Sequence, residues 1–144
     1  MAEAPHKLIL VIADFHKEIA ATMEATARAT AAKLGVSNIS TYTVAGCYEL
    51  PLIIDLLLER LRPDVLVALG YIERGETLDG EVMGNVVNRA LVELQLKHHR
   101  PIGVGMIGPG ATKEQALVRA EPKARGAVEA VVRTYTALHQ IERN

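Results

Sequence analysis

The side chains with potential for chemistry gather in three short segments, each of which follows an aliphatic run. These segments are Asp14–His16, Ala45–Glu49 and Tyr71–Asp79, and they carry aromatic, carboxylate, thiol and imidazole groups. An aromatic ring at such a corner can stack on a planar heterocycle. A carboxylate can accept hydrogen bonds from ring N–H groups. The combination is what recognition of a pyrimidine-like ring would require.

Ordinary structural roles compete with this interpretation. Phe15 could belong to the core, and His16 could cap a helix or face solvent. Glu49 could lie in the first turn of a helix, where a negative charge is favourable. Asp79 could be the N-cap of the helix that follows it. The residues alone leave these alternatives open.

Two further features indicate an anion. Gly75–Thr77 places backbone N–H groups in a loop before a predicted helix, which is a common arrangement for binding phosphate. Arg119, Lys123 and Arg125 cluster near the predicted start of the last helix. Cations there oppose the helix dipole unless an anion lies nearby. Surface solvation is the competing explanation, so each signal is weak by itself.

Other site classes are disfavoured. His98 and His99 are adjacent on a predicted helix and point in different directions, and neither has a Cys or Asp at metal-ligand spacing. We therefore expect no metal. No Gly-x-Gly-x-x-Gly follows the first aliphatic run and no Walker pattern is present, which argues against dinucleotide and P-loop sites.

Hydrophobic periodicity predicts alternating strands and helices. Apolar runs predict strands at 8–13, 39–44, 65–71 and 102–107. Helical spacing and stop signals predict helices at 16–34, 48–61, 79–98, 112–119 and 122–141, with a loop at 108–110. The third helix would carry one apolar stripe of Val82, Val86, Ala90 and Leu94.

This alternation predicts the fold class. Short strand–helix–strand connections are right-handed and produce a parallel sheet flanked by helices. Residues 1–144 have the length of one domain. Ligands bind such sheets outside the carboxyl ends of the strands. All three polar segments follow strands, as does Gly108–Thr112, so we expect the site at the edge where these four segments lie.

Composition narrows the partners and the compartment. The formal net charge of −1 gives no basic field for nucleic acid. Cys47 is the single cysteine, which fits a reducing compartment. Met1–Lys7 does not resemble a signal peptide, and no run approaches the roughly 20 apolar residues of a membrane span. We expect a cytoplasmic protein without membrane contact.

The helices carry apolar residues on nearly all sides, as in Leu91–Leu96. One sheet cannot cover that much apolar surface, so we expect a homo-oligomer.

Four motifs, in order along nearly the whole chain, resemble the 6,7-dimethyl-8-ribityllumazine synthase family of riboflavin biosynthesis. The first is Phe15 at the first corner, and the second is Gly-Cys-Tyr-Glu-Leu-Pro at 46–51. The third is Leu-Gly-Tyr-Ile-Glu-Arg-Gly-Glu-Thr at 69–77, and the fourth runs from Glu114 to Lys123. The resemblance implies a three-layer, flavodoxin-like α/β domain with a four-stranded parallel sheet, assembled as pentamers or icosahedral shells.

The resemblance also implies a reaction and its residues. Family members condense 5-amino-6-(D-ribitylamino)uracil with 3,4-dihydroxy-2-butanone 4-phosphate, without metal or organic cofactor, at sites between neighbouring subunits. The implied substrate-binding positions are Phe15, His16, Gly46, Cys47, Tyr48, Glu49, Tyr71, Ile72, Glu73 and Val104. The implied phosphate-binding positions are Glu76, Thr77, Arg119, Lys123 and Arg125, and the implied catalytic ones are Asp79 and Arg119.

Four positions depart from the family pattern. Asp79 stands where the family has its catalytic His, and Val104 where a neighbouring subunit contributes an aromatic ring. His16 stands where Asn is common, and Arg125 roughly where the family has a second Lys. A carboxylate is a poor proton donor at neutral pH, whereas imidazole titrates in that range. Losing a general acid–base group costs about 10²–10⁴ in rate, so we expect reduced activity.

The departures define an alternative. A divergent paralogue would keep the pocket and the assembly, bind a ribityl-pyrimidine or flavin or form a structural shell, and have little or no synthase activity. Asp79 and Val104 favour this alternative, whereas Glu49, Arg119 and the intact 75–77 motif favour the enzyme. A flavodoxin or a receiver-type signalling domain would need a hydroxyl-rich phosphate loop or an acidic cluster after the first strand, which Asp14–His16 does not supply.

Overall fold

The computed structural model describes residues 3–144. Met1 and Ala2, part of the segment considered above as a possible leader, lie outside the described residues. The elements follow one another as β1 (Lys7–Ala13), α1 (Lys17–Lys33), β2 (Asn38–Val44), a single 3-10 turn η1 (Cys47–Glu49), α2 (Leu50–Arg60), β3 (Val65–Glu73), α3 (Asp79–His98), β4 (Ile102–Ala111) and α4 (Lys113–Glu142). No helix within 3–144 has both the length and the apolar character needed to cross a membrane.

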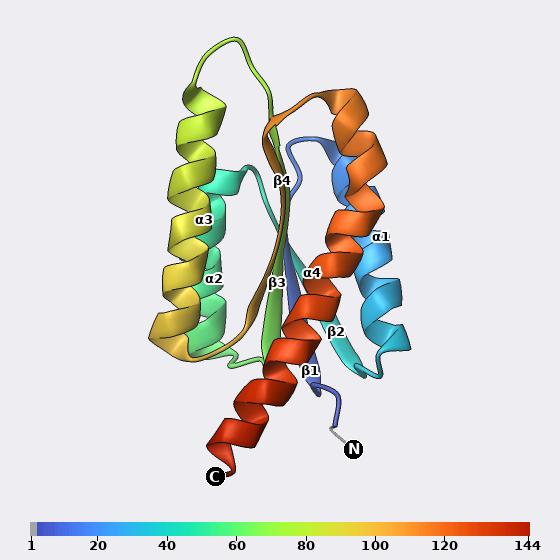
Figure 1. Cartoon of the computed structure of the whole chain (residues 1–144), viewed down its shortest axis with the longest axis vertical. Coiled ribbons are helices and arrows are strands. Elements are labelled where there is room, and N and C mark those ends of the chain that lie inside the picture. Colours follow the sequence, from blue (N-terminus) through green and yellow to red (C-terminus); the bar gives the residue numbers. More distant parts are fainter. Residues whose placement is uncertain (1–2) are drawn as a thin grey trace.

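The four strands form one parallel sheet in the order β2-β1-β3-β4. Figure 1 shows α2 and α3 covering one face of this sheet and α1 and α4 covering the other. This is the three-layer α/β arrangement that the sequence predicted. All the carboxyl ends of the strands lie at one edge because the strands are parallel, so the segments that follow them are brought together there.

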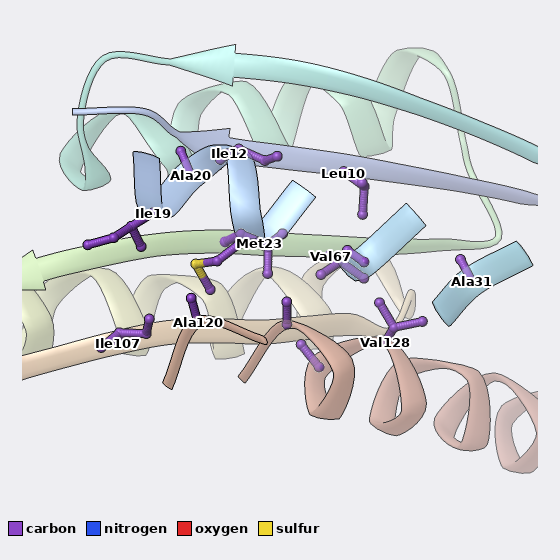
Figure 2. Packing of buried hydrophobic residues seen from close by; sticks show 14 of the residues in the cluster. Leu10, Ile12, Ile19, Ala20, Met23, Ala31, Val67, Ile107, Ala120 and Val128 are labelled. Carbon is purple, nitrogen blue, oxygen red and sulfur yellow. The ribbon is translucent and has the colours of Figure 1, made fainter. Parts of the chain in front are cut away.

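Alternate residues of β1 divide between two buried cores. Leu8, Leu10 and Ile12 face α1 and α4, whereas Ile9 and Val11 face α2 and α3. Figure 2 shows the first core, with Met23 of α1 and Val128 of α4 packed on the same side of the sheet as Leu10. Burying each such side chain contributes about 1.5–3 kcal/mol, so the two cores fix the register of the central strands.

Helix α4 lies very close to β4 because two glycines leave room for it. A Cβ atom on Gly103 would overlap the carbonyl oxygen of Ala127. A Cβ on Gly105 would lie 2.5 Å from Leu69 Cδ2 and 3.2 Å from Ala127 Cβ. The backbone of β4 is thus in direct contact with the helix, and no side chain separates them.

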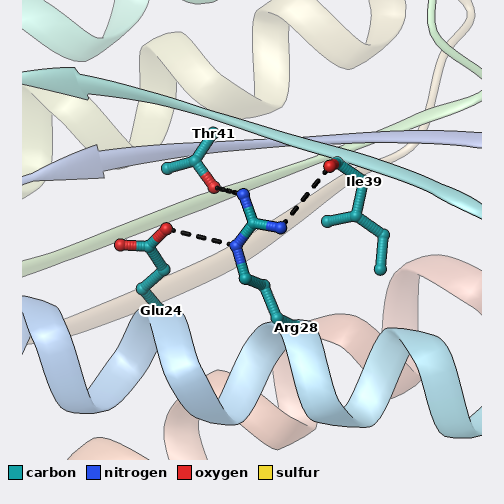
Figure 3. A network of polar contacts seen from close by, with 4 residues as sticks. All are labelled: Glu24, Arg28, Ile39 and Thr41. Atoms are coloured by element: carbon teal, nitrogen blue, oxygen red, sulfur yellow. Dashed lines mark hydrogen bonds and ion pairs between the residues drawn. The ribbon is translucent and has the colours of Figure 1, made fainter.

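A polar network joins α1 to the edge strand β2 (Figure 3). The Arg28 guanidinium donates from Nη2 to Thr41 Oγ1 at 2.6 Å and from Nη1 to the carbonyl oxygen of Ile39 at 3.5 Å. Its Nε donates to Glu24 Oε2 one turn earlier at 3.2 Å. The planar, forked guanidinium can reach these three acceptors together, which a Lys ammonium could not do with the same geometry.

The prediction of two helices at 112–119 and 122–141 is wrong, because Lys113–Glu142 is one helix with Pro122 inside it. Its N-terminus is fixed by a capping box in which Thr112 and Gln115 each bond the other's backbone N–H. Pro in a helix interior costs about 3 kcal/mol. Ala120 and Ala124, on either side of Pro122, are buried against the α1 face, and Pro122 itself faces solvent. Continuous burial of that face keeps the helix unbroken.

The predicted loop at 108–110 is also wrong. Strand β4 continues to Ala111, which pairs with Glu73 beyond a register shift in β3. Gly108 and Gly110 have φ of +89° and +92°, which only glycine adopts without strain, and this lets the strand bulge and continue. The backbone N–H of Arg74 then donates to the carbonyl oxygen of Ala111 at 3.0 Å.

The apolar stripe expected in α3 is buried only in part: Ala90 and Leu94 are half-buried, and Leu94 packs against the α2–α3 core. Val82 and Val86 are 54% and 53% exposed, whereas Gly84, Val87 and Leu91 are buried. The helix is apolar on more than one side, so periodicity alone could not select the face. The close approach of α3 to Pro109, which only Gly84 permits, selects it.

Candidate active site

A cavity of about 330 Å³ opens at the carboxyl ends of β1 and β3. These strands are neighbours in the sheet, but the helix after β1 covers one face and the helix after β3 covers the other (Figure 1). Parallel α/β proteins bind ligands in the crevice that such a divergence leaves. The predicted site residues that line it are Phe15, His16, Gly46, Cys47, Tyr71, Ile72, Glu73, Thr77 and Asp79. Three motifs far apart in the sequence therefore meet in one cavity.

A second cavity, of about 580 Å³, adjoins the first and shares Glu73, Gly75, Thr77 and Gly80 with it. Its other walls include Glu76, Glu81 and Arg74. Among its lining side chains, carboxylates outnumber cations. A phosphate bound there would need positive charge from outside this wall.

Aromatic rings form the floor and rim of the first cavity. The His16 ring centroid lies 4.6 Å from that of Tyr71 and 5.1 Å from that of Phe15. The Tyr71 hydroxyl donates to the carbonyl oxygen of Ala111 at 2.8 Å, which fixes this buried ring. Phe15 is 77% exposed, so its face is free to stack on a planar ligand. The core explanation of Phe15 is therefore wrong.

His16 lies at the N-cap position of α1, yet its side chain makes no capping hydrogen bond. It is directed instead toward β3, where its Nε2 lies 3.5 Å from Glu73 Oε2. The imidazole is 21% exposed and the Glu73 side chain 51%. The packing on Tyr71 and the contact with Glu73 hold the ring at the cavity wall.

Cys47 lines the cavity and is only 5% exposed. Burial, with the nearby Glu49 charge as a second cause, raises the pKa of its thiol to about 11. The thiol therefore stays protonated at neutral pH and is a packing group rather than a nucleophile. Tyr48 and Glu49 are both exposed and line neither of the two cavities.

Asp79 is the first residue of α3 and lies at the cavity wall. Leu78 occupies the N-cap position, so the helix-cap explanation of Asp79 is wrong. The backbone N–H of Asp79 donates to Thr77 Oγ1 at 3.3 Å, which shapes the turn before the helix. The carboxylate is exposed and faces the same space as His16 and Glu73.

The three cations expected to bind phosphate lie elsewhere in this chain. Arg119, Lys123 and Arg125 are exposed on α4, and none lines either cavity. Because α4 begins at Lys113, these residues lie beyond its first turn, and the argument from an opposing helix dipole no longer holds. Val104, half-buried on β4 beside the α2–α3 core, also lines neither cavity.

Three lining residues in the first two turns of α3 were not predicted from the sequence. Gly80 and Met83 line the first cavity, and Asn85 lines the second. Met83 follows Asp79 by four residues, and this spacing places two side chains on one helix face. That spacing was the available signal. Within residues 3–144 there is no group of three or more metal-ligating side chains.

Comparisons with known proteins identify the family of this parallel α/β protein. The family model for 6,7-dimethyl-8-ribityllumazine synthase matches residues 5–139. A 6,7-dimethyl-8-ribityllumazine synthase from Staphylothermus marinus is 37% identical over 133 residues, covering 92% of this chain and 89% of the relative. The synthase from Metallosphaera sedula is 38% identical, with 92% and 88% covered. The synthase from Methanopyrus kandleri is 35% identical, with 94% and 96% covered.

The chain belongs to the 6,7-dimethyl-8-ribityllumazine synthase family. The resemblance drawn from the four motifs is thereby confirmed, as is the flavodoxin-like fold class.

Proposed function

We propose that the chain is a transferase that condenses 5-amino-6-(D-ribitylamino)uracil with 3,4-dihydroxy-2-butanone 4-phosphate to give 6,7-dimethyl-8-ribityllumazine. The observation that carries this proposal is the meeting of Phe15, Cys47 and Ile72 with Thr77 in one cavity at the sheet edge. Its volume of about 330 Å³ is in the range of small-molecule sites. The relatives that align with nearly the whole chain are named for this activity.

The two adjoining cavities suit the two substrates. The first offers the exposed Phe15 face for a pyrimidine, with the backbone at Gly46 and Ile72 beside it. The second is bordered by the N-terminus of α3 and by backbone N–H groups near Glu76 and Thr77, which would bind the butanone phosphate. The shared wall at 73–80 would hold the two reactants next to each other. Holding two reactants in the correct orientation can lower the activation free energy of the reaction by about 7–11 kcal/mol.

The phosphate's positive partner must come from outside the acidic second cavity. Arg119 meets this need if a neighbouring copy of the chain presents its α4 to the cavity, with Lys123 and Arg125 farther along the same helix. Apolar side chains at Leu78, Val82 and Val86 are more than half exposed along α3, which supports a neighbour there. We therefore place the synthase in a homopentamer, or in a multiple of it, in the cytoplasm.

Incubation of the purified chain with both substrates tests the activity. Lumazine absorbance should appear only when both are present, faster than in a protein-free control. Binding of the pyrimidine with no lumazine above that control would contradict the proposal and favour the non-catalytic paralogue. Light scattering tests the assembly, since a monomer at micromolar concentration would exclude a site shared between copies.

A further inference from the structure

The first cavity contains few groups able to exchange a proton near neutral pH. Burial, together with the charges of Glu73 and Glu114, raises the pKa of Tyr71, and burial raises that of Cys47 to about 11. Both therefore remain protonated. Glu73 and Asp79 add two exposed carboxylates to the lining. The remaining titratable side chain of the lining within residues 3–144 is the imidazole of His16.

The surroundings of His16 suit an imidazole that transfers protons better than one that only stabilises the fold. Its side chain does not cap α1, although its backbone occupies the cap position. Nε2 faces the Glu73 carboxylate at 3.5 Å, and within residues 3–144 no hydrogen bond engages Nδ1. The ring is packed against Tyr71 and makes a T-shaped contact with Phe15. It is held in place while one nitrogen stays available.

We propose that His16, positioned by Glu73 and Tyr71, is the proton-transferring catalytic residue of this site and does the work that Asp79 cannot. This proposal rests on the proposed function. When the substrate amine nitrogen bonds to the ketone carbon, the neutral imidazole accepts a proton from that nitrogen, and the imidazolium passes it to the former carbonyl oxygen, which becomes a hydroxyl. A second transfer by the same route carries the remaining N–H proton to this hydroxyl, so that the C–O bond breaks, water leaves and the C=N bond forms. The imidazole ends the cycle as it began, with no oxidant or reductant involved.

The charges around His16 support both halves of that cycle. The carboxylate of Glu73 on β3 and that of Asp79 on α3 face the ring's cavity and stabilise the imidazolium after it forms. Tyr71 and Cys47 are neutral. On the ring's own segment, Lys17 is paired with Asp14 at 2.9 Å, so its charge is largely compensated. Glu73 thus acts as a positioning residue through His16.

The test compares His16→Asn with the unaltered protein. Asn is a favoured N-cap residue, so the variant should fold. We expect kcat to fall by about 10² or more while KM for both substrates changes little, because proton transfer is lost and binding is kept. The pH profile of kcat should differ between the two proteins, which loss of a merely structural residue would not produce. Glu73→Gln should give a smaller loss of kcat.

Two further variants separate catalysis from structure. His16→Ala should regain part of its rate when imidazole is added to the solution, which a merely structural residue would not show. His6→Gln changes an exposed histidine at the opposite end of β1 and should leave kcat unchanged. An unaltered kcat and pH profile in His16→Asn would overturn the inference alone. Absence of lumazine from the unaltered protein would overturn the proposed function, and this inference with it.

Discussion

Gly84 of α3 lies directly against the ring of Pro109 in β4: a Cβ atom on Gly84 would come within 2.6 Å of Pro109 Cδ and 2.9 Å of Pro109 Cγ. The contact sets the distance between α3 and the end of β4, and Pro109 borders the second cavity. The packing of a helix against a strand is therefore coupled to the shape of the candidate phosphate site.

Gly84→Ala should destabilise the protein. Alanine is normally favoured over glycine in a helix by about 1 kcal/mol, but the rigid proline ring cannot move aside and overpacking costs about 1–3 kcal/mol. Gly126→Ala is the matched control, because nothing lies within 4 Å of its added Cβ in α4. Thermal melting should show a lower Tm for Gly84→Ala and a higher one for Gly126→Ala. Equal gains in both would mean that Pro109 yields freely.

Asp55→Asn should weaken the junction of α2 and α3. The Asp55 carboxylate accepts hydrogen bonds from His98 Nε2 at 2.6 Å and Lys97 Nζ at 3.0 Å, which together lower its pKa below the ordinary 3.8. A lowered pKa stabilises the folded state above pH 4, and this stabilisation is lost as the pH falls. Urea unfolding should show a loss of about 1–3 kcal/mol at pH 7 that shrinks below pH 4.

The exposed pair Arg89–Glu93 provides the control for Asp55. Its side chains are 82% and 62% exposed, so Glu93→Gln should change the unfolding free energy by no more than about 0.5 kcal/mol at either pH. A loss for Asp55→Asn that does not depend on pH would point to lost packing rather than lost charge.

Cys47 should resist thiol reagents until the pH is strongly alkaline. With a pKa of about 11, its thiolate fraction at pH 8 is about 100-fold below that of an exposed cysteine. Glu49→Gln removes the second cause of the raised pKa and should speed modification, with burial still dominant. Because the unfolded thiol ionises first, stability should fall between about pH 9 and 11, and Cys47→Ala should reduce that fall. Rapid labelling at pH 8 would contradict this description.

Asp79→His should raise synthase activity, because it adds a second group able to donate and accept protons and removes a negative charge near the phosphate. The stability cost should stay within about 1 kcal/mol, since Asp79 lies in the first turn of α3 without capping it. The double variant with His16→Asn should recover much of the lost kcat if both positions serve proton transfer. Unchanged kcat in both backgrounds would exclude Asp79 from the reacting space.

Arg119→Ala should act on one substrate only. If Arg119 binds phosphate across a subunit boundary, KM for the butanone phosphate should rise about 10- to 100-fold, the equivalent of one or two charge-assisted hydrogen bonds. KM for the pyrimidine should stay within about twofold by the same reasoning. Arg133→Ala, another exposed cation on α4, is the matched control. Equal effects of the two variants would make Arg119 ordinary surface.

The central strands and the meeting of the polar segments after β1 and β3 were predictable, because each depends on a pattern within the sequence. The aliphatic runs of β1 and β3 are buried on both faces, and the polar segments after them line the cavity as the strand-end rule requires. The face of α3 was not predictable, since its burial depends on the Gly84–Pro109 contact between distant segments. Pro122 misled the helix prediction because local propensity cannot register the burial of Ala120 and Ala124.

Some residues of the candidate site could be predicted from the sequence and others could not. Phe15, His16 and Asp79 come to one cavity because each follows a strand. Arg119 and Val104 lie outside it, and no property of a single chain can show what they meet in a neighbouring copy. The His16–Glu73 pairing was also invisible in the sequence, because 57 positions separate the two residues and only the β1–β3 alignment brings them together.

The close contact of α4 with β4 determines where the chain tolerates substitution least. Gly103 and Gly105 perform no chemistry, yet any side chain at either would have to displace the helix backbone or the core, so a saturation library should tolerate almost nothing there. Exposed cavity residues such as Asp79 should accept many replacements without unfolding. Intolerance to mutation will therefore be strongest where the molecule is packed, and a map of variant abundance will outline the α4–β4 seam. Only a map of turnover will outline the site.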